Sequence, residues 1–245
     1  MPWITKNYLF AHKLCYNDRM SKIEIFPPHG WVALEDHSGT DLDIVNAAKV
    51  SFAKQSEEFG EAEDRVLGFL MREKHGSPFE HNHLKFHVRA PIFVVREWIR
   101  HRIGFSYNEE SGRYVELRPD FYIPEEAREQ KGKPGRYYFE SGTREQSKAL
   151  IAATKAQSKA AYKAYQDMLA QGIAKEQARI VLPLNTYTEF YCSCNARSLM
   201  SFLNLRMSPQ AMYEIRVYAE AMFELWGEAM PATAKAFEAN GFVAP

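Results

Sequence analysis

Two segments of alternating residues, each followed directly by a helical pattern, limit the folds open to this chain. In 83–89 the apolar Leu84, Phe86 and Val88 alternate with polar residues, which is typical of a strand with one buried face. The alternation returns in 186–194, a segment rich in aromatic and β-branched residues, and it predicts a second strand. Because helical patterns follow both strands and dominate the rest of the chain, the sequence predicts the α+β class.

Helical patterns fill most of the chain outside these two strands. The predicted helices cover 41–54, 65–74, a segment beginning at Pro91, 143–171, 175–181, 196–205 and 209–230. The longest, 143–171, contains neither Pro nor Gly, and Gly172 is placed to end it. Asn195 is expected to cap the helix that follows the second strand, because its side chain can accept a hydrogen bond from a free backbone N–H.

Length and charge balance narrow the class of protein. The 245 residues include 31 basic and 31 acidic side chains, and no run of about 18 apolar residues occurs. No linker rich in Pro, Gly or Ser divides the chain, and the N-terminus lacks the order of a signal peptide. We therefore expect one cytoplasmic domain over 1–245, with no membrane segment and no nucleic-acid surface. Residues 1–36 show little periodicity and leave their role open, and Trp3, Phe26 and Trp31 are expected to pack on the body.

The cysteines and histidines indicate neither a metal site nor a disulfide framework. Cys15, Cys192 and Cys194 are too few and too irregularly spaced for either. The last two lie two residues apart in the second predicted strand, so they share a face, and we expect them to be small core residues. The segment 75–81 contains two histidines and a glutamate, but it lacks the helical HExxH spacing, so we expect no metal site.

Arginines are concentrated around one polar segment. Arg96, Arg100, Arg102 and Arg113 lie on either side of a glycine-containing polar loop. The guanidinium group binds phosphate and carboxylate bidentately and keeps its charge. One interpretation is that these cations only complement the negative end of a helix dipole. The other is a site for a phosphorylated ligand, which the small hydrogen-bonding groups of the loop favour. These groups belong to Ser106, Asn108, Ser111 and Gly112.

The helix expected to begin at Pro91 would bring charged residues of the segment 96–101 close to one another. It would place Arg96 and Arg100 one turn apart, and likewise Glu97 and His101. Arg102 would then leave the C-terminus of the helix and enter the loop.

A second polar group lies on the helix after the second strand. Arg197, Ser201 and Asn204 form one stripe there, and apolar residues, including Leu205, form the other. An arginine closes this helix directly after its last predicted residue, and a further arginine precedes the strand. These two residues are Arg206 and Arg179. Each is either a structural arginine paired with a carboxylate or a residue that binds a ligand.

The Arg100-His101-Arg102 triplet, followed by SYNEESGRY over 106–114, resembles the signature of the flavin-dependent thymidylate synthases, the ThyX family. The resemblance extends, in the expected order, to three further segments: 75–81 (HGSPFEH), 179–183 (RIVLP) and 195–206. It runs from about Asp41 to about Trp226.

The resemblance implies a fold and an activity. The fold would be a single α+β domain with an antiparallel or mixed sheet flanked by helices, one of them long, and it would assemble as a homotetramer with FAD held where subunits meet. The activity would be conversion of dUMP to dTMP, with methylenetetrahydrofolate as carbon donor and NADPH as reductant of the flavin. Two alternatives stay open: a related enzyme that modifies C5 of the pyrimidine, for example by hydroxymethylation, and a non-catalytic nucleotide-binding protein.

Carried over position by position, the resemblance assigns residues to two ligands. Those that match flavin-contacting positions are Ser51, His75, Ser77, Glu80, Arg100, His101, Arg102, Ile103, Glu109, Asn195, Arg197 and Ser201. Those that match dUMP-binding positions are Glu97, Arg100, Glu109, Glu110, Ser111, Gly112, Arg113, Arg179 and Arg206. The loop together with Arg113 and Arg179 would bind the phosphate.

The chemistry of such a reaction selects Arg206 as the catalytic residue. Methylation at C5 of a uracil requires negative charge to accumulate on the pyrimidine oxygens and N3, and a fixed cation there lowers the barrier. Neither strand cysteine lies in a Pro-Cys-His-like context, so we expect no thiolate nucleophile. Ser111 is assigned to substrate positioning, and the hydride that completes the methyl group would come from reduced flavin, since no side chain supplies one. His75 and His101 are then flavin contacts, with proton transfer by either as the alternative.

Overall fold

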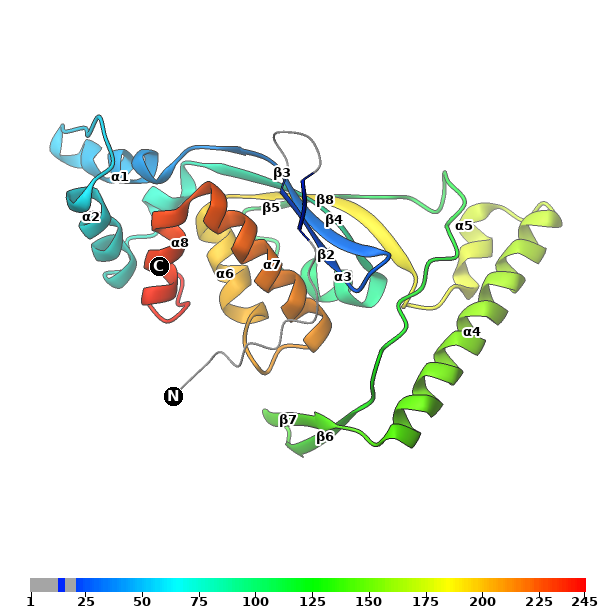
Figure 1. The fold of residues 1–245 in the computed structure, drawn as a ribbon. Coiled ribbons are helices and arrows are strands. Elements are labelled where there is room, and N and C mark those ends of the chain that lie inside the picture. The colour runs from blue at the N-terminus through cyan, green and yellow to red at the C-terminus, as the bar shows by residue number, and fades with distance from the viewer. Residues whose placement is uncertain (1–12, 16–20) are drawn as a thin grey trace.

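The computed structural model describes residues 13–15 and 21–245. Six strands form one sheet in the order β1-β2-β3-β4-β8-β5 (Figure 1). These strands are β1 (Lys13–Cys15), β2 (Ser21–Ile25), β3 (Gly30–Ser38), β4 (His83–Pro91), β8 (Tyr187–Cys194) and β5 (Phe105–Glu109). Every neighbouring pair is antiparallel, so the α+β class is confirmed and the sheet is antiparallel rather than mixed.

The two segments predicted as strands lie side by side in this sheet. β4 pairs with β8, with Phe86 opposite Cys192 and Val88 opposite Phe190. These four side chains and Cys194 are buried, as the alternation predicts for the inner face of a strand. The alternation therefore identified the strands and their buried face correctly.

Three helices cover one face of the sheet (Figure 1): α6 (Ala196–Arg206), α7 (Tyr213–Ala229) and α8 (Pro231–Ala239). The core lies between them and the sheet. Its largest fully buried side chains include Trp98, Trp226, Tyr218, Phe86 and Phe202. Asn195 caps α6 as predicted, because its side chain accepts a hydrogen bond from Ser198 N at 2.9 Å.

The long helix is confirmed almost to the residue. α4 (Arg144–Ala170) begins after a capping box formed by Thr143 and Gln146. It ends just before Gly172, which has a φ of 78°. Among the described residues, no helix is both long and apolar enough to cross a membrane.

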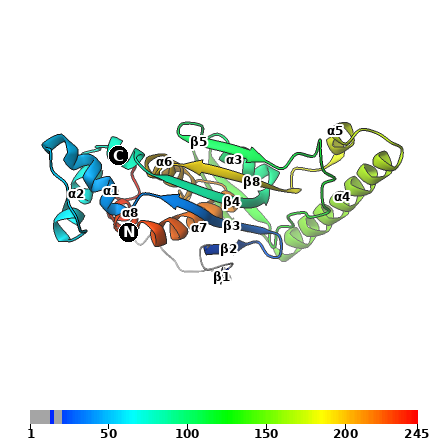
Figure 2. The ribbon, with the colours of Figure 1, turned by 90° about the horizontal axis from the view of Figure 1, so that it is seen from above.

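The long helix belongs to an arm that stands away from the sheet. The arm also contains α5 (Lys175–Ala178), which falls within the predicted helix 175–181, and a hairpin of β6 (Arg128–Lys133) and β7 (Arg136–Ser141). The sequence did not predict the hairpin. Figures 1 and 2 show this arm at the opposite end of the molecule from α1 (Asp41–Lys49) and α2 (Glu61–Arg72).

The helix after β4 is shorter than predicted. α3 (Ile92–Trp98) ends before Arg100 and His101. The backbone N–H of His101 donates to the carbonyl of Trp98 at 3.0 Å, and the Tyr107 hydroxyl donates to the carbonyl of His101 at 2.7 Å. These bonds close a turn where the helix would have continued, so the expected one-turn spacings across this segment are wrong.

The polar loop contains a strand that the sequence did not predict. β5 pairs with the outer edge of β8, with Phe105 opposite Cys194 and Tyr107 opposite Cys192. Phe105 and Tyr107 pack against the core, while Ser106 is exposed. Aromatic and polar residues do alternate in this segment, but a pattern with only two aromatic residues is too short to predict a strand.

Residues 1–36, whose role the sequence left open, supply β1, β2 and most of β3. Phe26 packs on the core as expected, with its ring 5.1 Å from that of Tyr122. Trp31 packs edge-on against His87, with the ring centroids 4.7 Å apart. The prediction for Trp3 falls outside the described residues.

Helix boundaries differ from the prediction in smaller ways. α1 gives way to a 3-10 turn (Val50–Phe52), and a second such turn (Arg179–Val181) follows α5. α2 begins four residues earlier than expected and α7 four residues later. Leu205 is 59% exposed, so its placement on the apolar stripe of α6 is wrong; the stripe is formed by Leu199, Phe202 and Leu203.

Candidate active site

Arg206, the predicted catalytic residue, is held by three hydrogen bonds. It is the last residue of α6, and its side chain is 17% exposed. Its Nε donates to His101 Nε2 at 2.9 Å, its Nη1 to Glu97 Oε2 at 2.7 Å and its Nη2 to the Glu97 carbonyl at 2.9 Å. The structure is consistent with both interpretations of this residue. Arg206 pairs with a carboxylate, as a structural arginine would, and its partners are themselves predicted ligand-binding residues.

His101 is a neutral ring beside this cation. Burial of the ring and the nearby Arg206 guanidinium lower the pKa of His101 to about 4, and the Glu97 carboxylate acts in the opposite direction. The ring packs edge-on against Phe202 with centroids 4.9 Å apart. At neutral pH the ring is therefore a hydrogen-bonding group and not a proton donor of useful acidity.

The residues predicted to hold the phosphate form a second group, near α5. Gly112 is buried against Arg179, since a Cβ at this glycine would lie 3.1 Å from Arg179 Cδ. Arg113 Nε donates to Glu176 at 2.9 Å, and the Ser111 hydroxyl accepts a bond from Arg113 N at 3.3 Å. Arg179 is exposed and has no ion pair with any described residue. The Arg179 guanidinium therefore has no ion-pair partner among the described residues, and the Arg113 guanidinium is in an exposed ion pair with Glu176.

Several residues predicted to contact FAD form a third group, at the N-terminus of α6. Arg197 makes an ion pair with Glu80. A Cβ at Gly76 would lie 2.5 Å from Arg197 Cζ, so the absence of a side chain at this glycine makes room for the guanidinium. His75 and Ser77, on either side of Gly76, are exposed. The guanidinium of Arg197, the hydroxyl of Ser77 and the imidazole of His75 therefore lie close together near the N-terminus of α6.

The remaining predicted residues are dispersed. Glu109 Oε1 accepts a bond from the Thr188 hydroxyl at 2.7 Å, and Glu110 lies 3.7 Å from Arg118. The Ser201 hydroxyl donates to the Arg197 carbonyl at 3.2 Å, within its own helix. Exposed side chains without a described polar contact belong to Ser51, Arg100, Arg102 and Ile103. The 92% exposure of Ile103 is far above that of an ordinary core isoleucine.

One chain does not bring all these residues together. His75 lies near the α1–α2 end of the molecule, whereas Arg113 and Arg179 lie near α5 at the other end, as the element labels of Figure 1 show. The cluster of Glu97, His101 and Arg206 lies at the C-terminal ends of α3 and α6. The predicted arginines therefore do not converge within a single chain.

The strand cysteines do not resemble nucleophiles. Burial raises the pKa of both the Cys192 and the Cys194 thiol well above the ordinary range. They are core residues, as the sequence predicts. Within 13–15 and 21–245, no group of three His, Cys, Asp or Glu residues could hold a metal ion.

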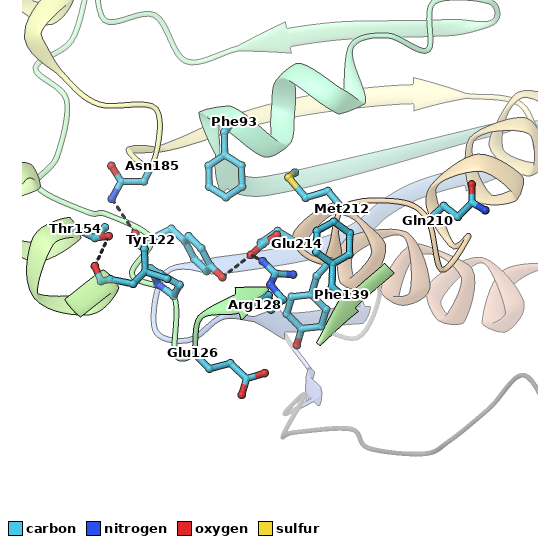
Figure 3. Close-up of a pocket in the computed structure, with 13 residues that line it drawn as sticks. Phe93, Tyr122, Glu126, Arg128, Phe139, Thr154, Asn185, Gln210, Met212 and Glu214 are labelled. Atoms are coloured by element: carbon cyan, nitrogen blue, oxygen red, sulfur yellow. Dashed lines mark hydrogen bonds and ion pairs between the residues drawn. The ribbon is translucent and has the colours of Figure 1, made fainter. Parts of the chain in front are cut away.

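A cavity of about 550 Å³ lies between the β6–β7 hairpin, α4 and the start of α7 (Figure 3). None of the predicted site residues lines it. The buried Glu214 accepts a hydrogen bond from the Tyr122 hydroxyl at 2.9 Å and makes an ion pair with Arg128. Sequence reasoning missed this cluster because its members come from separate segments with no shared motif, and its charges are already satisfied by each other.

Comparison with known proteins places the chain in a family. The family model described as "Thymidylate synthase complementing protein" (Thy1) matches residues 33–232. Proteins named flavin-dependent thymidylate synthase are similar to most of the chain. The one from Streptomyces avermitilis is 46% identical over 228 residues, covering 87% of this chain and 93% of its own. The one from Tropheryma whipplei is 49% identical over 229 residues, covering 87% of this chain and 94% of its own.

A solved structure shares the fold. It is a UMP/dUMP methylase, PolB from Streptomyces cacaoi, bound with 5-Br dUMP. It is 42% identical, matches with a TM-score of 0.81, and covers 87% of this chain and 97% of its own. Family model, relatives and fold agree, and the chain therefore belongs to the Thy1, or ThyX, family of flavin-dependent thymidylate synthases.

Proposed function

We propose that this protein converts dUMP to dTMP, with FAD as cofactor, methylenetetrahydrofolate as carbon donor and NADPH as reductant. The observation that carries the proposal is the Arg206 guanidinium, fixed by three hydrogen bonds to Glu97 and His101 in a chain of this family. A fixed cation of this kind is what a uracil needs when negative charge develops on its ring.

The residues around Gly76 fit a flavin dinucleotide. The Arg197 guanidinium supplies a cation for a pyrophosphate. This guanidinium occupies the space that a Cβ at Gly76 would fill. The exposed Ser77 hydroxyl and His75 ring supply further hydrogen-bonding groups. We infer that these residues, together with Arg102, hold FAD, which when bound and reduced supplies the hydride that completes the methyl group.

The protein's own residues bind and polarise the nucleotide. Arg113 and Arg179, with the Ser111 hydroxyl, would bind the phosphate, because the guanidinium fork matches its oxygens. Arg206 would donate N–H bonds to the pyrimidine and stabilise the charge that makes C5 nucleophilic. A covalent adduct with Cys192 or Cys194 is not part of the proposal, since neither thiol ionises in the core.

The assembly we propose is a homotetramer in which neighbouring copies complete each site. The support is the separation, within one chain, of the residues near His75 from Arg113 and Arg179. Analytical ultracentrifugation of the purified protein measures the mass directly. A monomer that retains full activity would contradict the proposal.

A second substrate deserves a test because of one observation. The similar structure of 42% identity belongs to a UMP/dUMP methylase, so UMP is a candidate substrate besides dUMP. Hydroxymethylation at C5 is the other alternative for the product. Mass spectrometry of the nucleotide after reaction with dUMP or UMP separates all three: a methyl group on dUMP alone, a methyl group on both nucleotides, or an added hydroxymethyl group.

The test of Arg206 uses release of tritium from C5-labelled dUMP. We expect Arg206→Ala to fold and bind FAD but to release tritium about 10² to 10³ times more slowly, which is the usual cost of removing a donor that stabilises a developing charge. Arg65→Ala is a matched control, since that side chain is 71% exposed on α2. Near-normal release by Arg206→Ala would overturn the assignment.

A further inference from the structure

The three bonds of Arg206 differ in kind. Two go to oxygens of Glu97, and the third goes from Nε to the ring nitrogen Nε2 of His101 at 2.9 Å. A guanidinium nitrogen can only donate, so Nε2 must carry the lone pair, and the ring proton must be on Nδ1. His101 is therefore bound to Arg206 as a neutral acceptor, a role separate from the flavin contact that the family resemblance implies for it.

We propose that His101 is the positioning residue of Arg206, and that its Nε2 fixes the plane of the guanidinium before the nucleotide binds. The inference rests on the proposed function, because the plane of Arg206 matters only if a pyrimidine binds against it. His101 acts here through another residue, in addition to any contact with a cofactor.

The ring is well placed to hold a fixed direction. It packs edge-on against Phe202 at 4.9 Å and faces Phe105 at 6.3 Å, measured between ring centroids. Its backbone is fixed on both sides of the Cα, by the bond from its N–H to the Trp98 carbonyl at 3.0 Å and by the bond from the Tyr107 hydroxyl to its own carbonyl at 2.7 Å. The acceptor atom therefore has little freedom to move with the arginine.

The neutral acceptor prevents a competing arrangement. A carboxylate and a guanidinium prefer two parallel hydrogen bonds, and such a fork with Glu97 would let the carboxylate alone set the plane of Arg206. Here only one carboxylate oxygen is used, because Nη2 binds the Glu97 carbonyl and Nε binds His101. Two of the five N–H bonds of Arg206 have no partner among the described residues and are free for a ligand.

The charge state of the ring supports this arrangement. The charged groups that face it are Arg206, from α6, and Glu97, from α3, while Phe202 and Phe105 are apolar. Burial and the guanidinium lower the pKa of His101 to about 4, so Nε2 keeps its lone pair throughout the neutral range. A protonated ring would place two donors face to face and break the bond.

The test is a double-mutant cycle between His101 and Arg206. His101→Leu removes the acceptor, His101→Gln keeps one at the end of a side chain of similar length, and Arg206→Lys keeps the charge but lacks the Nε–H. Two quantities are measured in each variant: dUMP affinity by titration calorimetry and tritium release from C5-labelled dUMP. FAD content and the midpoint of thermal unfolding are recorded alongside, and His37→Leu, an exposed histidine on β3, is the control.

We expect His101→Leu to slow tritium release about 10²-fold, the cost typical of a misplaced catalytic group, and His101→Gln to recover most of this loss. In the Arg206→Lys background the same His101→Leu change should alter release less than about 2-fold, because residues that act as a unit are not additive. If His101→Leu does not fold, His101→Asn, whose shorter amide does not reach Arg206, takes its place in the cycle.

Two results overturn the proposal: a loss that multiplies in the Arg206→Lys background, or a His101→Gln variant that is as slow as His101→Leu while it keeps its FAD and its unfolding midpoint. Failure of the proposed function looks different. The wild-type protein would then release no tritium, and the coupling between His101 and Arg206 would be read from dUMP affinity alone. A non-additive affinity would support the positioning role, and an additive one would reject it.

Discussion

Substitution of Gly104 tests the conformation of the turn between His101 and β5. Gly104 has a φ of 69°, a region that disfavours any side chain. A Cβ there would also overlap Ser198 Oγ and lie 3.1 Å from Ser198 Cβ. Gly104→Ala should therefore strain the backbone and push the turn away from α6, taking His101 with it.

The expected loss of stability has three parts. The left-handed conformation costs about 1–2 kcal/mol for alanine, and crowding against Ser198 adds about 1–3 kcal/mol. Restriction of the unfolded chain returns about 0.4–1 kcal/mol. We therefore expect Gly104→Ala to lower the free energy of unfolding by about 3 kcal/mol, which for a chain of this size is a fall in melting temperature of about 6–12 °C.

The assay is urea unfolding followed by circular dichroism at one fixed protein concentration, since association makes the midpoint depend on concentration. Ser198→Ala removes the overlapping oxygen, so the double variant Gly104→Ala/Ser198→Ala should recover about half of the loss and keep the part due to φ. Ser198→Ala alone is the control. A loss below about 0.5 kcal/mol for Gly104→Ala, within the range of neutral surface changes, would refute the described turn. Absence of any recovery in the double variant would refute the contact with Ser198.

Two further predictions concern the nucleotide site and the pH range. Ser111→Ala should weaken dUMP binding, measured by calorimetry, while it leaves detectable turnover, because the hydroxyl positions the substrate and does not react; complete loss of turnover with unchanged affinity would count against this role. The folded protein holds the pKa of His101 near 4 instead of 6.5, so the unfolded chain binds the extra proton first as pH falls. The free energy of unfolding should thus decrease between about pH 6.5 and about pH 4, by about 1–2 kcal/mol after allowance for partial exposure. His101→Gln should make this part of the pH profile flatter, and an unchanged slope would contradict the assignment.

Elements with a strong local signal could be predicted from the sequence. β4 and β8 alternate over enough residues to identify both the strand and its buried face, and α4 contains no helix breaker between Thr143 and Gly172. Asn195 caps α6 because the capping bond is made within four residues. Each of these signals depends on neighbours in sequence, so no tertiary contact is needed to produce it.

Elements that depend on distant partners were missed. β5 is a strand because the edge of β8 is there to pair with it, and β2 and β3 join the sheet through pairing that one segment alone does not specify. α3 stops at Trp98 because the Tyr107 hydroxyl, from β5, fixes the turn that follows. In each case the deciding bond joins residues that belong to different elements.

The sequence by itself determined the class of fold, the family resemblance and the identity of the candidate residues, because motif order and local periodicity are properties of the chain. Only the tertiary structure decided what those residues do to one another. Glu97 and His101 appeared in the sequence as separate contacts of nucleotide and flavin, yet both bind Arg206, which lies more than a hundred residues further along the chain. The physical reason is that the direction of a guanidinium is set by the acceptors that surround it, and these are brought together only when α3, the turn after it and the end of α6 pack on the same core.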